Sequence, residues 1–243
     1  MEEKKTEKKL VSSCAACGVQ KCVFPGRKEP RPKFCPIVIN EEEAQKAMDI
    51  LFSEKAVGTE DYKINMAAEF VIHQAFDDDY GPTLSYFEEV MEFARFMKWK
   101  KIGIACCIAL VEESREIDRI MKANGFETVS VMCMAAGGTR HSQGLGWQVK
   151  FVQGLPLCNP VMQAFVLNKE ETEFNLQVGL CVGHDILFRK YSKAPVTVIA
   201  IKDRVLANNP MGAIYTANLF YFNRLLPQAD VFGKAGEELF ARR

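Results

Sequence analysis

The chain has 243 residues, of which 48% are apolar and 26% charged, so it is long enough to bury a core of one large domain, with or without a small appendage. This composition excludes a disordered chain, a collagen-like repeat and a small scaffold held by disulfides. Basic and acidic residues number 31 each, which gives a formal net charge of zero. A whole-chain basic field is therefore absent, and we expect no nucleic-acid partner.

Residues 1–10 are predicted to form a disordered charged tail. They begin MEEKKTEKK and lack the apolar region of a secretion signal. No apolar run in the chain approaches the about 20 residues that a membrane span needs. We therefore expect a cytoplasmic protein without a membrane partner, in a compartment where thiols stay reduced.

Nine cysteines are the unusual feature of the composition. An odd number in a reducing compartment argues against a disulfide framework, so metal binding is the first interpretation and redox thiols the second. Four of the cysteines crowd, with four prolines, into residues 11–38. This segment has too little apolar periodicity to fold around a core of its own. We predict a metal-binding module, in which the metal supplies the missing stabilisation.

The predicted metal ligands are Cys14, Cys17, Cys22 and Cys35, in the pattern C-x2-C-x4-C-x12-C-P. Four thiolates suit either a tetrahedral zinc ion or a 4Fe–4S cluster. Cys14 to Gly18 looks like half of a zinc knuckle, but the second C-x2-C pair is missing. The order of the spacings resembles the four-cysteine 4Fe–4S module of electron-transport subunits and corrinoid iron–sulfur proteins. We favour the cluster over zinc, and over unliganded thiols in a flexible tail, which would be reactive.

Residues 39–100 are predicted to form a helical region packed on the domain that follows. Asn40 is expected to cap the first helix, with Glu43 reaching back from the third position. Apolar residues at helical spacing between 64 and 75, and again between 84 and 97, indicate a second and a third helix.

From residue 101 to 243 short apolar runs alternate with helical patterns. Strands are predicted at 102–107, 127–134, 175–182 and 196–202. Helices are expected near 110–123, from Pro160, through 187–191, and from Pro210 to just before Pro227. Such alternation indicates βαβ crossovers. The predicted fold class is α/β: an open, mostly parallel sheet of about four strands, with an N-terminal helical region and a cysteine-rich metal module.

The remaining cysteines lie at the predicted ends of strands, or just before a helix. Because the carboxyl ends of parallel strands line the ligand crevice, we expect them to form a second, cofactor-binding site. Its predicted residues are Cys106, Cys107, Cys133, Cys158, Cys181 and His184. Cys158 is the best single candidate, since a thiolate beside a helix N-terminus is stabilised by the macrodipole. The alternative is that these cysteines pack as small core hydrophobes.

A glycine-rich stretch joins the second strand to the helix at Pro160. Its residues Thr139, Arg140 and His141 could hold an anion, but no dinucleotide-binding or Walker fingerprint is present. A surface loop is the favoured interpretation.

Several short segments stand in a familiar order: Ser13–Gly18, Cys35-Pro36, Ile104–Cys107, Cys158–Pro160, Gly179–Asp185 and Ala194–Arg204. Together they resemble a cysteine-rich family of anaerobic bacteria and archaea, an uncharacterised metal-binding domain of unknown function. The resemblance runs from about Cys14 to Tyr215. It implies metal binding through the cysteines and implies no reaction.

These observations favour a metalloprotein whose N-terminal cluster passes electrons to the crevice site or braces it. A redox partner protein or a small-molecule substrate is the expected partner. The alternative is a non-enzymatic protein with a structural zinc in the N-terminal module. A thiol oxidoreductase using Cys106-Cys107 or Cys158 ranks last, because adjacent cysteines rarely form a redox pair and the α/β part has no C-x-x-C motif. The sequence leaves open whether the protein is an enzyme.

Overall fold

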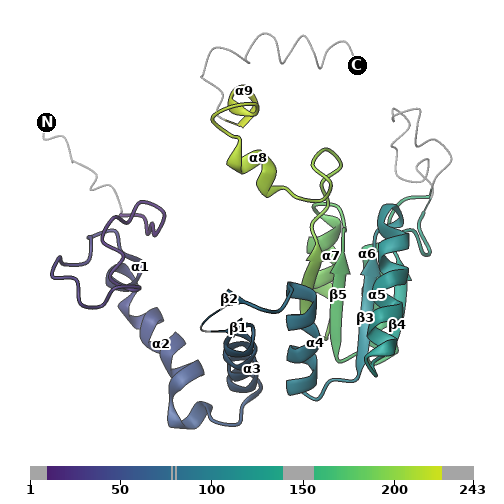
Figure 1. The fold of residues 1–243 in the computed structure, drawn as a ribbon, viewed down its shortest axis with the longest axis horizontal. Coiled ribbons are helices and arrows are strands. Elements are labelled where there is room, and N and C mark those ends of the chain that lie inside the picture. The colour runs from purple at the N-terminus through teal and green to yellow at the C-terminus, as the bar shows by residue number, and fades with distance from the viewer. Residues whose placement is uncertain (1–9, 78, 80, 139–155, 226–243) are drawn as a thin grey trace, which may run out of the picture. The chain divides into compact units, whose positions relative to one another are not determined.

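The computed structural model describes residues 10–77, 79, 81–138 and 156–225 (Figure 1). The chain divides into two compact units, Met1–Thr83 and Leu84–Arg243, and each is described by itself. The boundary falls inside residues 39–100, which the sequence analysis treated as one helical region. The third helix of that region belongs to the second unit, because its apolar face is part of that unit's core.

The first unit is helical. It contains α1 (Pro36–Ile39), α2 (Glu41–Phe52), the 3-10 turn η1 (Glu54–Ala56), α3 (Glu60–Gln74) and the short antiparallel pair β1 (Phe76–Asp77) and β2 (Gly81–Pro82). Asn40 stands at the predicted N-cap of α2, but the expected capping bond is not formed. Its side chain instead donates to Ser12 Oγ and to the Pro36 carbonyl, at 3.0 Å each. It therefore ties the start of α2 to the cysteine-rich segment.

The second unit is built on a parallel sheet in the order β4-β3-β5-β6. The strands are β3 (Lys101–Cys106), β4 (Glu127–Met132), β5 (Phe174–Val178) and β6 (Val196–Ala200). This confirms the α/β prediction of an open parallel sheet with about four strands. The third strand ends sooner than predicted, because Gly179 adopts φ +65° and turns the chain out of the sheet.

Helices cover both faces of this sheet (Figure 1). On one face α4 (Tyr86–Phe96) and α5 (Val111–Ala123) pack on alternate residues of β3, namely Ile102, Ile104 and Cys106. On the other face α6 (Pro160–Lys169) and α7 (His184–Tyr191) pack on Ala105 and Cys107. The alternation of side chains along a strand therefore sends two adjacent cysteines into different cores.

Capping residues predicted from the sequence stand at the end of α5 and at the start of α6. Asn124 stands at the C-cap of α5, and Gly125 follows with φ +86°. Asn159 is the N-cap of α6, where its Oδ1 accepts a hydrogen bond from the Met162 N–H at 3.0 Å, and Pro160 takes the first helical position.

The prediction of one long final helix is wrong. The chain forms two short helices, α8 (Met211–Tyr215) and α9 (Phe222–Leu225), separated by turns. Thr216 is the C-cap of α8, where its backbone N–H and its hydroxyl both donate to the Gly212 carbonyl, at 3.3 and 2.7 Å. Within the described ranges, no helix is both long and apolar enough to cross a membrane.

Candidate thiol sites

The cysteine-rich N-terminal segment is closed by hydrogen bonds between its two ends. The Ser13 N–H donates to the Phe34 carbonyl at 3.2 Å, which brings the neighbours of Cys14 and Cys35 together. A tight turn joins Cys14 to Cys17, whose N–H donates to the Cys14 carbonyl at 3.0 Å. The four cysteines are therefore held in one compact loop rather than in an extended tail.

Arg31 joins the other two thiols of this loop. Its Nη1 lies 3.0 Å from Cys22 Sγ, and the guanidinium also forms a hydrogen bond with the Cys35 thiol. Burial acts to raise the pKa of Cys35, but the backbone N–H groups of Ile37 and Val38 and the Arg31 charge bring this pKa below its ordinary value. Arg31 was not predicted to take part, although it lies between two predicted ligands in the sequence.

The same segment has no hydrophobic core. Residues 10–35 form no helix or strand, and Cys35 is the one buried residue between positions 10 and 55. Val11 and Val23 are 77% and 69% exposed. Hydrogen bonds alone rarely hold such a loop in one conformation, since each contributes little net stability. The side chains of this segment therefore do not bury enough apolar surface to stabilise its fold.

The four thiols of the N-terminal loop are suitable metal ligands by residue type, but their positions do not form a metal site. Four thiols, with N–H donors on Cys17 Sγ (from Gln20, 3.4 Å) and on Cys35, are the donor set that zinc and iron–sulfur clusters take. However, nowhere in the described ranges do three or more His, Cys, Asp or Glu side chains converge closely enough to hold a metal ion. The residue types fit the predicted group, and the sulfur atoms are not gathered around one point.

Three cysteines of the second unit meet at the carboxyl ends of β3 and β4. Cys107 follows β3, Cys133 follows β4, and Cys158 precedes α6. Cys133 Sγ lies 3.6 Å from Cys158 Sγ and accepts hydrogen bonds from the Cys107 thiol and from the Ile108 N–H, the latter at 3.4 Å. The structure thus brings together three of the six residues predicted for the crevice.

Backbone pairing places Cys158 beside Cys133. The Asn159 N–H donates to the Cys133 carbonyl at 2.6 Å, and the Asn159 side chain donates to the Ala136 carbonyl at 3.0 Å. The Leu157 N–H donates to the Gly138 carbonyl at 2.8 Å. The segment before α6 therefore runs along the segment after β4, and this pairing fixes the two thiols in contact.

Gln163, which the sequence analysis overlooked, braces the strand ends from α6. Its side-chain Nε2 donates to the carbonyls of Cys106 and Val131, at 3.1 and 2.7 Å. The residue is fully buried, and its Oε1 has no hydrogen-bond partner among the described residues. A glutamine on a helical face gives no sequence signal for this role, since glutamine is common on exposed helical surfaces.

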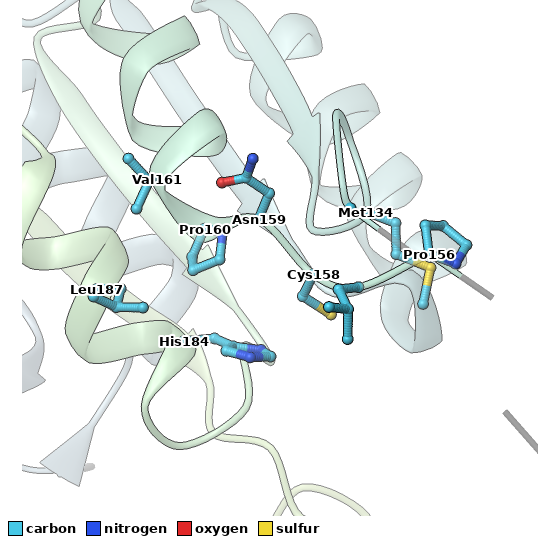
Figure 2. Close-up of a pocket in the computed structure, with 10 residues that line it drawn as sticks. Met134, Pro156, Cys158, Asn159, Pro160, Val161, His184 and Leu187 are labelled. Carbon is cyan, nitrogen blue, oxygen red and sulfur yellow. The ribbon is translucent and has the colours of Figure 1, made fainter. Parts of the chain in front are cut away.

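A pocket of about 470 Å³ opens beside these thiols (Figure 2). Cys158 and His184 both line it, from the start of α6 and the start of α7. Most of the other lining residues are apolar: Met134, Pro156, Leu157, Pro160, Val161 and Leu187. The volume and lining are typical of a site for a small molecule.

Cys107 and Cys133 have different affinities for protons. The hydrogen bond to Cys133, together with burial, raises the pKa of Cys107 far above its ordinary value. The hydrogen bond received from Cys107 lowers the pKa of Cys133, against the effect of its burial, and the Ile108 N–H adds to the lowering. Cys133 is therefore the favoured thiolate of this pair, with Cys107 as its hydrogen-bond donor.

Two predicted residues of the crevice lie elsewhere. Cys106 faces the opposite core, where it contacts Ser114 and its Sγ lies 3.7 Å from the Val131 carbonyl oxygen. The choice that the sequence left open between Cys106 and Cys107 is decided in favour of Cys107 by the strand alternation. Cys181 accepts a hydrogen bond from Arg204 Nη2 at 3.0 Å and is not among the described residues that line the pocket. Thr139, Arg140 and His141, the predicted anion site, lie outside the described residues.

Comparison with known proteins identifies the family. Residues 40–199 match the family described as protein of unknown function (DUF1847). The chain belongs to this family. It is also 45% identical over 139 residues to the uncharacterized protein MJ0455 of Methanocaldococcus jannaschii, a match that covers 57% of this chain and 70% of that protein. No solved structure matches.

The DUF1847 match divides the cysteines in two groups. It includes all five cysteines of the second unit and begins after the four cysteines of the N-terminal loop. The prediction of a cysteine-rich family without an assigned reaction is confirmed. The family description names neither a metal nor a substrate.

Gly137 offers a test of the backbone pairing beside the pocket. A Cβ atom at this position would lie 1.8 Å from the Leu157 carbonyl oxygen, a backbone atom that cannot rotate away. Gly137→Ala is expected to destabilise the second unit by about 2 kcal/mol and to separate Cys133 from Cys158. Urea unfolding and cross-linking of the two thiols by dibromobimane measure the two effects. Gly26→Ala, which has no neighbour within 4 Å of a new Cβ, is the control. Wild-type stability and cross-linking in Gly137→Ala would contradict the pairing.

Proposed function

We propose that this protein binds a 4Fe–4S cluster through Cys14, Cys17, Cys22 and Cys35 and carries electrons in the cytoplasm. The observation that carries the proposal is a loop that is closed at its ends but has no core, in which Cys35 is the one buried residue between positions 10 and 55. Small segments of this kind take their stability from a bound metal group. Cysteine thiolates are the ligands that iron–sulfur clusters use.

The surroundings of the four thiols support a negatively charged group. Backbone N–H groups already point at Cys17 and Cys35, and Arg31 contacts Cys22 and Cys35. Hydrogen bonds to cluster sulfurs and nearby positive charge raise the reduction potential of such clusters. The residues of this loop would therefore hold the cluster and set its potential, while the cluster itself would supply the one-electron chemistry.

A structural zinc in the same loop is the alternative function. The tight turn between Cys14 and Cys17, closed by a 3.0 Å hydrogen bond, is the feature that favours it. Zinc has no redox chemistry, and a closed site of four thiolates leaves no position for a substrate. With zinc the loop would be an element of structure, and the protein would not carry electrons through it.

The test is the content of iron, zinc and acid-labile sulfide in protein purified without oxygen. About four iron and four sulfide per chain, with a brown absorbance that dithionite bleaches, are expected. Cys22→Ser is expected to lower the iron content, whereas Cys106→Ser, in the core of the other unit, is the matched control. One zinc without sulfide would support the alternative. Protein that lacks both metals, and takes up neither on reconstitution, would overturn both functions.

A further inference from the structure

We propose that Cys133 and Cys158 form a redox-active dithiol that reduces small organic disulfides in the pocket at the starts of α6 and α7. The two residues are 25 positions apart in the sequence, so they form no C-x-x-C motif. The proposal does not depend on the N-terminal loop, because every residue that it uses belongs to the second unit.

The geometry of the pair is that of a reduced dithiol ready to close. The two sulfur atoms are 3.6 Å apart, and a disulfide bond needs about 2.05 Å. The backbones on both sides are already joined by the 2.6 Å hydrogen bond from Asn159 to Cys133. Oxidation therefore needs rotation of two side chains and no rearrangement of the segments that carry them.

The two cysteines differ in access to the pocket. Cys158 is half-buried and lines the pocket, whereas Cys133 is 2% exposed and lies behind it. A disulfide substrate in the pocket meets Cys158 first. Cys158 is therefore the attacking thiol, and Cys133 is the resolving thiol that substrate does not reach directly.

Proton transfer follows from the hydrogen bonds of Cys133. The hydrogen bond from Cys107 lowers the pKa of Cys133, whereas the Cys158 sulfur, 3.6 Å away, raises that pKa and so favours a proton on Cys133 when Cys158 is the thiolate. As Cys158 attacks, its proton passes to Cys133. Cys107 is a positioning residue: it keeps the sulfur of Cys133 stabilised as an anion but forms no bond with the substrate.

The reaction balances in two steps. The Cys158 thiolate attacks one sulfur of the disulfide RSSR, which forms the mixed disulfide Cys158–S–S–R and releases RS⁻, and RS⁻ takes the proton held by Cys133. The Cys133 thiolate then attacks Cys158 Sγ and releases the second RS⁻, which is protonated by water or by His184 in the pocket. The disulfide is reduced to two RSH, and the dithiol is oxidised to Cys133–S–S–Cys158.

The pocket selects the substrate class. Its volume of about 470 Å³ admits a small organic molecule, and its walls are mainly Met, Pro, Leu and Val side chains. No Lys or Arg is among the described residues that line it. We therefore assign it to disulfides with small, uncharged organic groups, and we expect a thiol reductant to restore the dithiol.

The test is a single turnover of reduced, full-length protein with bis(2-hydroxyethyl) disulfide in the absence of oxygen. Free thiols are then alkylated and the protein is digested with trypsin. Cleavage after Lys and Arg leaves Cys107, Cys133 and Cys158 in separate peptides, residues 102–115, 123–140 and 151–169. The expected product is a cross-link between the peptides of Cys133 and Cys158, with the mixed disulfide on Cys158 present at roughly a tenth of that amount or less.

Variants separate the three roles. Cys133→Ser is expected to stop at the mixed disulfide on Cys158, and Cys158→Ser to leave Cys133 alkylated as a free thiol. Cys107→Ala is expected to slow cross-linking by roughly tenfold and to move its pH dependence upward, because Cys133 loses a donor. Cys106→Ser, on the other face of the sheet, is expected to behave as wild type.

Three results would overturn the proposal. The first is a mixed disulfide on Cys158 that persists in the wild type, and the second is a cross-link between Cys107 and Cys133 in place of the expected one. The third is a Cys158 thiol that does not react with the disulfide in the folded protein but does react with it after unfolding in urea. None of these readouts involves iron, so failure of the dithiol and failure of the N-terminal cluster are distinguishable.

Discussion

If the N-terminal loop binds the proposed metal group, its chelation is expected to expose residues 10–35 to proteases while the second unit stays folded. The loop has no helix or strand and buries one residue, Cys35, so little remains to hold it once its ligands are free. Structural metal sites of four ligands contribute about 10–16 kcal/mol, most of which is folding free energy of the segment around them. We expect trypsin cleavage after Lys21 and Arg27 to accelerate by more than about a hundredfold.

The measurement is limited trypsin digestion before and after treatment with a chelator and dithionite, followed by mass spectrometry of the fragments. Cys22→Ser is expected to be cleaved rapidly even as purified, and Cys106→Ser to be protected like the wild type. The far-UV circular dichroism of the α/β unit should change little. Equal cleavage rates with and without the metal would show that the loop is held by something other than its cysteines.

Gly103→Ala is expected to destabilise the second unit by about 3 kcal/mol. Gly103 is buried on the central strand β3, and a Cβ there would lie 2.0 Å from Asn175 Oδ1 and 2.9 Å from Leu167 Cδ1. Asn175 is itself buried and cannot simply move. Its Oδ1 accepts from the Thr172 hydroxyl at 2.8 Å, and its Nδ2 donates to Ser192 Oγ at 2.9 Å. Displacement would leave buried polar atoms without partners, which is costly.

Urea unfolding followed by tryptophan fluorescence measures this effect, because the Trp99 ring packs against Phe174 of β5 with the ring centroids 5.0 Å apart. Gly212→Ala is the matched control: its Cβ would lie 3.4 Å from Leu206 Cδ1, an ordinary contact, so the change should stay within about 1 kcal/mol. In the Gly103→Ala background, Asn175→Ala should recover part of the loss. An unfolding midpoint equal to wild type in Gly103→Ala would mean that the strands separate more easily than the packing indicates.

Local signals in the sequence were enough to predict the sheet and several helix ends. The alternation of apolar runs and helical patterns after residue 101 predicted the parallel α/β fold, and Asn124-Gly125 and Asn159-Pro160 marked helix boundaries correctly. These signals act within one turn of chain, so neighbours far away in sequence do not change them. Asn40 was placed correctly at the start of α2, but its side chain bonds to Ser12 and Pro36 in place of the predicted cap, and the final helix was predicted too long.

Which cysteines lie together at the thiol site depended on tertiary contacts, and no short sequence motif predicts these contacts. Cys106 and Cys107 are adjacent in the sequence, yet the alternation of β3 buries them in opposite cores. Cys133 and Cys158 are 25 residues apart, yet a backbone pairing at the end of β4 brings their sulfur atoms within 3.6 Å. Residue types and spacing therefore predicted two groups of cysteines, and their function stays a prediction. Which of them touch was decided only by strand register and helix packing, since these alone set the distances between distant parts of the chain.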